Sequence, residues 1–495
     1  MHLSSLPGTQ GIGTMGREAR AFVDFLVRAG QRYWQVLPTC PTGYGDSPYQ
    51  SFSTFAGNPY FIDLALLAED GLLEKRDYDA IDWQSTPEDI NYGSLYEKKY
   101  PVLHQAVRRF LRRPDPGFQA FCAREAGWLT DYALFMALKD ACGGLPWWQW
   151  PEPLRNRRPD VLRTAGETYR REVEFWMAVQ YLFHRQWRSL KAYANARGIA
   201  LIGDLPIYVS RDSVDVWARP ELFQLDGNRI PREVAGCPPD GFSASGQLWG
   251  NPLFDWDYLR RTGYAWWVQR IERLCGMYDR LRIDHFRGFE AYYAIPFGAG
   301  SARDGRWRPG PGIDLFRAVE RALGPVPIIA EDLGFLTDGV RRLLRESGYP
   351  GMKVLEFAFD SRDGGGEEYL PQNYPVHCVA YTGTHDNEPI QGWLATAPAA
   401  DVARARQVLG LGDPACAHWD MMRSLWESPA ELTVVQTQDL LGLGSESRMN
   451  TPSTVGGNWR WRVRPDALTP ELADRIRQEM HRCGRCTAAQ QPDGK

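Results

Sequence analysis

The chain has 495 residues and a formal net charge of −4. This length exceeds one small domain and is compatible with an α/β barrel of about 250 residues that carries long insertions. The weak net charge and the lack of a long basic run offer no electrostatic attraction for nucleic acid or an anionic membrane, so we expect neither as a partner.

The nine cysteines form an odd, scattered set, and the first seven residues have neither the basic nor the apolar part of a secretory signal. No apolar run approaches the ~18 residues of a membrane span. We therefore expect free thiols in a soluble, cytoplasmic protein. Cys483 and Cys486 form a lone C-x-x-C without a second pair or a His cluster, so no zinc site is expected there.

Short apolar or β-branched runs recur along the chain and are separated by stretches of helical periodicity. In chain order, strands are predicted over 2–6, 33–37, 200–205, 280–284, 327–331, 352–357, 378–384 and 431–437. Helices are predicted between several of them, for example over 16–29 and 313–323. Eight strands that alternate with helices predict an α/β fold, the (β/α)8 or TIM barrel.

One long tract interrupts this alternation. Residues 65–198 are mainly helical in pattern, with helices predicted over 96–113 and 172–197. We therefore expect a catalytic barrel formed by 1–64 and 199–495, with 65–198 as an inserted helical subdomain.

Two loop-rich stretches, 206–256 and 438–461, follow barrel strands. The carboxyl ends of barrel strands carry the active site, so these long loops should shape a substrate cleft. The chain also has nineteen Trp, most of which we expect in the core; only those in loops near the cleft are candidates for stacking on a ligand.

Three carboxylates stand where predicted strands end, namely Asp284, Glu331 and Asp386. A retaining glycosidase-type site needs a nucleophilic carboxylate and a carboxylic acid that later acts as base, with the two groups ~5–5.5 Å apart. The set therefore indicates a carbohydrate enzyme.

Each carboxylate also has a structural interpretation. Arg282 lies on the same side of its strand as Asp284 and would keep that carboxylate ionised, but a purely structural Arg–Asp pair is the commoner arrangement. Glu331 in an apolar cleft would have a raised pKa and act as a general acid. Asp332 should point to the opposite face, or cap the following helix.

His385 and Asp386 place a donor and a carboxylate at one point of the barrel rim. With eight His in the chain and no H-x-x-x-H spacing, we expect no metal site and no cofactor. Hydrogen bonding to sugar hydroxyls is the favoured role.

Longer motifs resemble a known family. The segments GDLPIYV (203–209), LRIDH (281–285), AEDLG (330–334) and THDN (384–387) resemble the four ordered signature regions of the α-amylase superfamily. More narrowly, PTGYGDSPYQS (41–51), RMNTP (448–452) and GNW (457–459) are similar to the amylomaltases, the 4-α-glucanotransferases also called disproportionating enzymes. The resemblance runs over nearly the whole chain.

The resemblance implies that Asp284 is the nucleophile of a covalent glucosyl-enzyme, that Glu331 is the acid/base, and that Asp386 binds sugar hydroxyls and favours the transition state. It also implies a set of substrate-binding residues: Tyr49, which stacks beneath the sugar, Asp204, Arg282, His285, His385, Asp240, Gln247 and Trp249 of a covering loop, and Asn458 of the facing loop. Tyr44 and Tyr92 are implied as a secondary glucan contact.

The implied activity moves α-1,4-glucan segments between maltooligosaccharides or starch- and glycogen-type glucans, which act as donor and acceptor. An amylase-like retaining hydrolase and a non-catalytic glucan-binding protein are the alternatives, and the oligomeric state stays open. Two features depart from the family. The Gly-Leu/Ile-Leu-Leu run that usually precedes the equivalent of His2 is missing, so the first strand should be cut short: either translation starts upstream or the barrel closes differently. Cys237 and Gly241 also replace an aliphatic and a larger residue in the covering loop.

Overall fold

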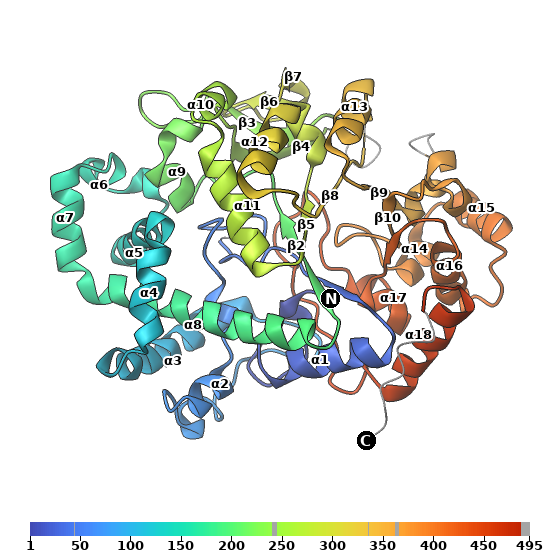
Figure 1. Cartoon of the computed structure of the whole chain (residues 1–495), viewed down its shortest axis with the longest axis horizontal. Helices are drawn as coiled ribbons and strands as arrows, with labels where there is room; N and C mark the ends of the chain where they lie inside the picture. The colour runs from blue at the N-terminus through green and yellow to red at the C-terminus, as the bar shows by residue number, and fades with distance from the viewer. Residues whose placement is uncertain (44, 240–244, 335, 362–365, 487–495) are drawn as a thin grey trace.

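The computed structural model describes residues 1–43, 45–239, 245–334, 336–361 and 366–486. Its centre is a sheet of seven strands in the order β1-β2-β5-β8-β9-β10-β11, and each neighbouring pair is parallel. The strands are β1 (Tyr33–Gln35), β2 (Ala200–Leu205), β5 (Arg280–Ile283), β8 (Ile328–Ala330), β9 (Gly351–Val354), β10 (Cys378–Tyr381) and β11 (Leu432–Val434). Helices surround them (Figure 1). The predicted barrel is confirmed, with seven of its strands.

The predicted strand over 2–6 is wrong. Leu3–Ser5 forms a buried 3-10 helix, η1. The Ser4 carbonyl accepts the N–H of Gly13 and the Ser5 carbonyl accepts that of Val463, so loops take the groups that a strand would pair with β1. The described strands therefore form a nearly closed barrel, and a cavity of about 100 Å³, lined on both sides by residues of β1 and β11, lies between its two edge strands.

Successive side chains of a strand point to opposite faces of the sheet, so the barrel strands contribute one layer of side chains to the barrel interior and one to the contact with the helices. One buried cluster joins Ile202, Ile329, Met352, Val354, Val379, Tyr381 and Leu432. Their neighbours in the sequence, such as Leu201, Ile328 and Ala380, belong instead to the large cluster that includes the surrounding helices. Positions in phase with Ile202 and Ile329 therefore point into the barrel, and Asp204 and Glu331 continue those two series at the strand ends.

Outside the tract between β1 and β2, the outer helices all follow a barrel strand except α1, which precedes β1. They are α1 (Arg17–Arg28), α9 (Val214–Ala218), α10 (Trp256–Arg261), α11 (Ala265–Met277), α12 (Ile313–Leu323), α13 (Asp338–Ser347), α14 (Ile390–Thr396), α15 (Ala399–Leu409), α16 (Ala417–Trp426), α17 (Thr437–Leu441) and α18 (Pro470–Arg482). The helices predicted over 16–29 and 313–323 are thus confirmed. In the described residues, no helix has the length and apolar character that a membrane crossing requires, and the nine cysteines are all free thiols.

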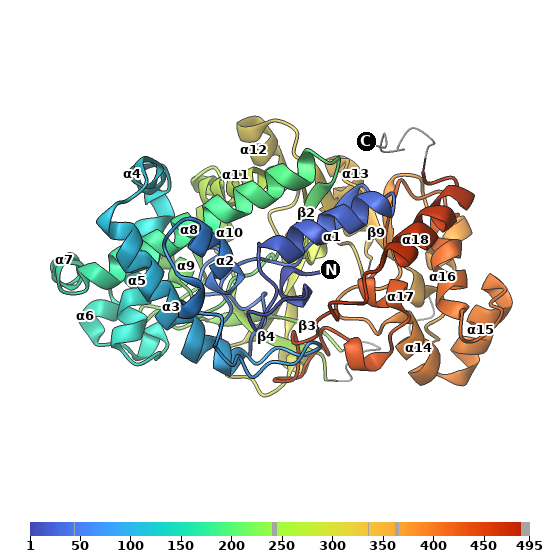
Figure 2. The ribbon, with the colours of Figure 1, turned by 90° about the horizontal axis from the view of Figure 1, so that it is seen from below.

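The tract between β1 and β2 is helical. It holds α2 (Leu64–Glu69), α3 (Tyr92–Arg112), α4 (Pro116–Arg124), α5 (Ala126–Ala141), α6 (Glu152–Arg155), α7 (Pro159–Thr168) and α8 (Arg170–Asn195). Helices α3 to α7 lie at one end of the molecule and α14 to α18 at the other, with the barrel between them (Figure 2). Leu103 and Phe183 of this tract share a buried cluster with Leu281 of β5. The proposed insertion 65–198 therefore packs on the barrel through a continuous core.

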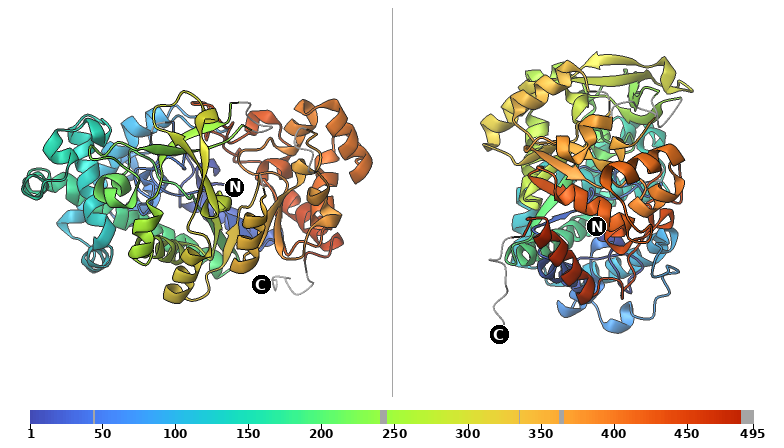
Figure 3. Two further views of the ribbon diagram at one scale, coloured as in Figure 1. Left: turned by 90° about the horizontal axis from the view of Figure 1, so that it is seen from above. Right: turned by 90° about the vertical axis from the view of Figure 1, so that its right-hand side faces the viewer.

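A second sheet, which the sequence patterns did not predict, lies beside the barrel (Figures 1 and 3). It is antiparallel, with the order β4-β3-β6-β7. Its strands are β3 (Glu233–Cys237), β4 (Gln247–Pro252), β6 (Ala291–Pro296) and β7 (Arg306–Pro309). Two of them form inside the stretch 206–256, so this part of the predicted loop region is a sheet that supports the cleft.

Candidate active site

A shared guanidinium joins the first two strand ends of the site. The register of β2 and β5 places Asp204 opposite Arg282, and Arg282 Nη1 donates to Asp204 Oδ1 at 2.9 Å and Oδ2 at 2.8 Å. The same nitrogen lies 3.0 Å from Asp284 Oδ1. Burial alone would lower the pKa of Arg282, but Asp204 and Asp284 raise it well above its ordinary value. Arg282 is therefore a fixed cation between two carboxylates.

The two carboxylates differ in access. The Asp204 side chain is fully buried, whereas that of Asp284 keeps 28% of its surface exposed. Arg282 therefore pairs with Asp284, as the sequence suggested, and also with the fully buried Asp204, which the sequence did not predict. Asp284 receives the same positive charge and still faces the cleft.

Glu331 is held by a turn at the end of the neighbouring strand. His285 has a left-handed backbone with φ of 52°, which is uncommon for a residue with a side chain and is found at functional sites. This turn aims the His285 N–H at Glu331 Oε2, 2.6 Å away. The Leu333 N–H donates to Glu331 Oε1 at 2.9 Å. Both carboxyl oxygens are therefore oriented by the backbone.

Burial gives Glu331 a different protonation state from an ordinary glutamate. Desolvation is the main cause that raises its pKa to about 8; the negative charge of Asp284 raises it further, while Arg282 and the two N–H groups lower it. At neutral pH the group therefore carries a proton. This is the state that a general acid requires.

Asp332 has a structural role, as expected, although it does not cap a helix. Its buried Oδ1 accepts the N–H of Met352 at 2.7 Å, which joins the end of β8 to β9. Thr337 is the residue that caps α13.

An aromatic group lies beside these carboxylates. The Tyr49 hydroxyl donates to Asp204 Oδ2 at 2.8 Å. The Tyr49 ring stacks on His385, with a centroid distance of 4.9 Å and an interplanar angle of 17°. Trp459 packs against both rings, at 5.8 Å and 5.6 Å. The loops that contain these three residues thus meet at one point.

Asp386 follows the end of β10 and keeps 45% of its side chain exposed. Asn450 Nδ2 donates to Asp386 Oδ1 at 2.6 Å. Arg448 donates to the Asp386 carbonyl and, at 2.6 Å, to Glu388 Oε1. We did not predict Arg448 and Asn450 as site residues, although the RMNTP segment that contains them was a signal.

The second sheet reaches the site through His285. Trp249 of β4 meets the His285 ring edge to face at 5.0 Å, and its indole N–H donates to Gln247 Oε1 at 3.1 Å. His285 Nε2 is buried and has no hydrogen-bond partner in the described part of the chain. Burial lowers the pKa of His285 to about 4, so the ring is neutral at pH 7. It offers an uncommitted polar atom beside Asp284.

The other predicted residues lie farther out or outside the described residues. Asn458 accepts the Thr451 N–H at 3.0 Å and donates to Thr454 Oγ1 at 3.0 Å, so its hydrogen bonds stabilise its own loop. The Tyr92 hydroxyl donates to the Trp459 carbonyl at 3.0 Å. Tyr44, Asp240 and Gly241 lie outside the described residues, and Cys237 ends β3.

The geometry brings two carboxyl groups with different protonation states to adjacent strands, β5 and β8. Arg282 supplies a positive charge to Asp284, while burial keeps Glu331 protonated. Two titratable groups separated in this way by their surroundings can divide nucleophilic and acid roles.

Comparisons with known proteins identify the family. A family model described as 4-alpha-glucanotransferase matches residues 1–469. The 4-alpha-glucanotransferase of Thermus thermophilus is 50% identical over 489 residues, or 96% of each chain. That of Clostridium butyricum is 46% identical over 491 residues, or 98% of this chain and 100% of the relative. An amylomaltase from Streptococcus agalactiae, solved in complex with acarbose, has a TM-score of 0.95 and 43% identity and covers 98% of this chain and 99% of its own. The chain therefore belongs to the 4-alpha-glucanotransferase family and is an enzyme that transfers glycosyl groups.

Proposed function

We propose that this enzyme transfers α-1,4-glucan segments by a retaining double displacement, with Asp284 as nucleophile and Glu331 as acid and base. The observation that carries the proposal is the contrast between Asp284, which forms an ion pair with Arg282, and the buried Glu331, whose pKa is raised by that burial. A retaining mechanism needs these two states at the same time.

In the first step, a carboxylate oxygen of Asp284 attacks C1 of a glucose unit in the donor. The bond between C1 and the glycosidic oxygen breaks, and Glu331 gives its proton to that oxygen. The shortened glucan leaves with a free 4-hydroxyl. The remaining segment is bound to Asp284 as an ester, and Glu331 is now a carboxylate.

In the second step, Glu331 takes the proton of an acceptor's 4-hydroxyl. The acceptor oxygen attacks C1, the bond to Asp284 breaks, and an α-1,4 linkage forms again. Transfer wins over hydrolysis when the cleft admits a sugar better than water. Trp249 and Trp459 on the two flanking elements support such a cleft, because they pack against His285 and His385, the residues next to Asp284 and Asp386.

The substrate class follows from the groups that remain available for a sugar. Tyr49 and His385 present a stacked aromatic surface, and Asp386 and His285 present polar atoms for hydroxyls. The Streptococcus agalactiae relative was solved with acarbose. We propose maltooligosaccharides and starch- or glycogen-type glucans as donor and acceptor, and a cytoplasmic location without nucleic-acid or membrane partners.

Incubation with maltotriose tests the transfer reaction. Transfer yields glucose and a ladder of longer oligomers without a net gain in reducing ends. A steady rise in reducing ends would identify a hydrolase instead. Unchanged maltotriose, together with maltotriose binding in calorimetry, would identify a protein that only binds glucans.

A further inference from the structure

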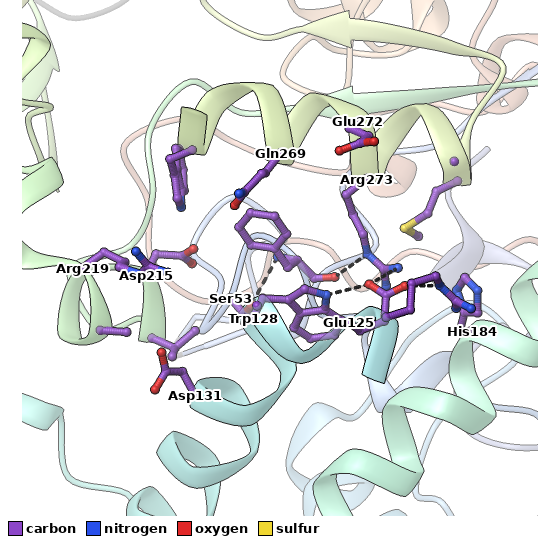
Figure 4. Close-up of a pocket in the computed structure, with 18 of the residues that line it drawn as sticks. Ser53, Glu125, Trp128, Asp131, His184, Asp215, Arg219, Gln269, Glu272 and Arg273 are labelled. Atoms are coloured by element: carbon purple, nitrogen blue, oxygen red, sulfur yellow. Dashed lines mark hydrogen bonds and ion pairs between the residues drawn. The ribbon is translucent and has the colours of Figure 1, made fainter. Parts of the chain in front are cut away.

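A cavity of about 640 Å³ lies between the helical tract and the outer side of the barrel (Figure 4). One wall comes from α5 and α8, through Trp128 and His184. The other comes from α11 and the segment after β1, through Trp266, Arg273 and Phe55. The three active-site carboxylates do not line it. Cavities of ~300–1,000 Å³ have the size of small-ligand sites, so this cavity is large enough to bind a small ligand.

Three aromatic rings give the cavity an apolar surface. Phe55 stacks with Trp128 at 6.3 Å and 17°, and it meets Trp266 edge to face at 6.0 Å and 78°. Phe55 is buried and holds the group in place, whereas the two Trp side chains are only half-buried. Their remaining surface offers flat contact for a ligand with an apolar face.

A polar network joins the two walls of the cavity. Glu125 Oε2 accepts the indole N–H of Trp128 at 2.8 Å and Arg273 Nη1 at 3.0 Å. Arg273 Nε also donates to the Phe55 carbonyl at 3.4 Å, and its guanidinium lies 5.0 Å from the Trp128 ring centroid. Figure 4 shows these side chains pointing toward one another. The polar groups are therefore ordered before any ligand arrives, which lowers the entropy lost on binding.

Further polar atoms in the lining have no role in this network. His184 Nδ1 is buried without a hydrogen-bond partner in the described residues. Burial, assisted by Arg273, lowers the pKa of His184 to about 4, so the ring is neutral at pH 7. Gln269 of α11 is exposed at the rim and points into the cavity (Figure 4). These groups suit hydroxyls, which both donate and accept.

The charges of the lining favour a neutral ligand. Four arginines face four carboxylates around the cavity: Arg124, Arg188, Arg219 and Arg273, with Glu125, Asp131, Asp215 and Glu272. A phosphate site would need an excess of positive charge, and a cation site an excess of negative charge. Aromatic faces, ordered planar polar groups and balanced charge together describe a site for a sugar.

We propose that this cavity is a second carbohydrate site, which holds a short stretch of α-1,4-glucan, about two or three glucose units, outside the active site. The choice of an α-glucan rests on the function proposed above. A glucan chain held here has a raised effective concentration at the enzyme. Long donors should therefore gain more from the cavity than maltotriose does.

The test uses two glycines in open positions. Gly127 of α5 lines the cavity, and a Cβ atom there would meet nothing within 4 Å, so we expect Gly127→Phe to fold and to place its ring in the cavity. Gly166 of α7 has the same open surroundings away from the cavity and gives the matched control, Gly166→Phe. Both changes are made in an Asp284→Asn background, and maltotriose binding is measured by calorimetry and in a soaked crystal.

We expect Gly127→Phe to bind one maltotriose fewer per chain than Gly166→Phe, with density between Trp128 and Trp266 in the control only. In enzymes with Asp284 restored, the same change should raise the KM for long amylose roughly tenfold and leave maltotriose kcat unchanged. Equal stoichiometry in the two variants, or competition by inorganic phosphate for the cavity, would overturn the proposal. Failure of the proposed function would appear separately, as the absence of a maltotriose product ladder.

Discussion

The active site has two halves that differ in burial: an inner half at the ends of β2, β5 and β8, and an outer half in the loops that follow β10 and β11. Asp204, Arg282 and Glu331 sit at strand ends and are 3%, 4% and 9% exposed, whereas Asp386 keeps 45% of its side chain in the open and Asn458 lies in a loop. Burial is what raises the pKa of Glu331, so the acid and base role that we propose for this residue depends on its place in the buried half. The hydroxyl binding that we propose for Asp386 and Asn458 requires no such burial.

The largest effect on activity is expected from a change to the proposed nucleophile in the inner half. Asp284→Asn keeps the shape of the side chain but loses its charge, so we expect kcat for maltotriose to fall about 10⁴-fold or more while glucan binding is largely kept. Rapid-quench product analysis and calorimetry measure the two quantities. Near-normal turnover would remove Asp284 from the role of nucleophile.

The next change removes the acid. Glu331→Gln should lower kcat for maltotriose by roughly 10²–10⁴-fold. Because the raised pKa of Glu331 is about 8, the proton is present below that pH and lost above it. Wild-type kcat/KM should therefore fall as the pH rises through 8.

With α-maltosyl fluoride, whose leaving group needs little protonation, the Glu331→Gln enzyme should accumulate the ester on Asp284. Mass spectrometry would detect it as an added maltosyl group. If kcat/KM of the Glu331→Gln enzyme still falls above pH 8 as in the wild type, another residue is responsible for that fall.

A smaller effect is expected in the outer half at Asn450. Its side chain donates to Asp386 Oδ1 at 2.6 Å, and a hydrogen bond to a charged group contributes about 1.5–3 kcal/mol. Asn450→Ala should thus lower kcat/KM by roughly 10–100-fold with the melting temperature little changed. Rescue of activity by Asn450→Gln would show that donation to Asp386, rather than packing, is the cause.

The smallest effect should come from Asn458. Its described hydrogen bonds go to Thr451 and Thr454 of its own loop, and a neutral bond of this kind contributes about 0.5–1.5 kcal/mol. Asn458→Ala should raise KM a few-fold and leave kcat within twofold. A loss of kcat as large as that in Asn450→Ala would mean that both loops serve the reaction equally.

The sequence allowed prediction of the inner half, because strand patterns place Asp284 and Glu331 without knowledge of distant contacts. It did not allow prediction of contacts made across the chain. Arg448 reaches Asp386 over 62 positions and Asn450 reaches it over 64, and no local period encodes such pairs.

Two errors in the fold have physical causes of the same kind. The apolar run at 2–6 has the composition of a strand, but Gly13 and Val463 take its carbonyls and Pro7 offers no N–H to a ladder. In the second sheet, β3 begins at Glu233, which Arg306 and Arg308 bind from β7 at 2.9 Å each. Glu233 therefore finds its partners on a strand more than 70 positions away, and no local pattern of the sequence reveals this pairing.

The left-handed turn at His285 has a mechanical consequence. Asp284 and the N–H that orients Glu331 belong to consecutive residues, and Glu331 also donates its own N–H to the Ile283 carbonyl at 3.0 Å. If the end of β5 moves, Asp284 moves with it, and the hydrogen bonds from this segment to Glu331 should move Glu331 in the same direction. In the mechanism proposed above, both groups act on the same glucose unit, so we expect these two hydrogen bonds to hold their separation constant when a glucan binds.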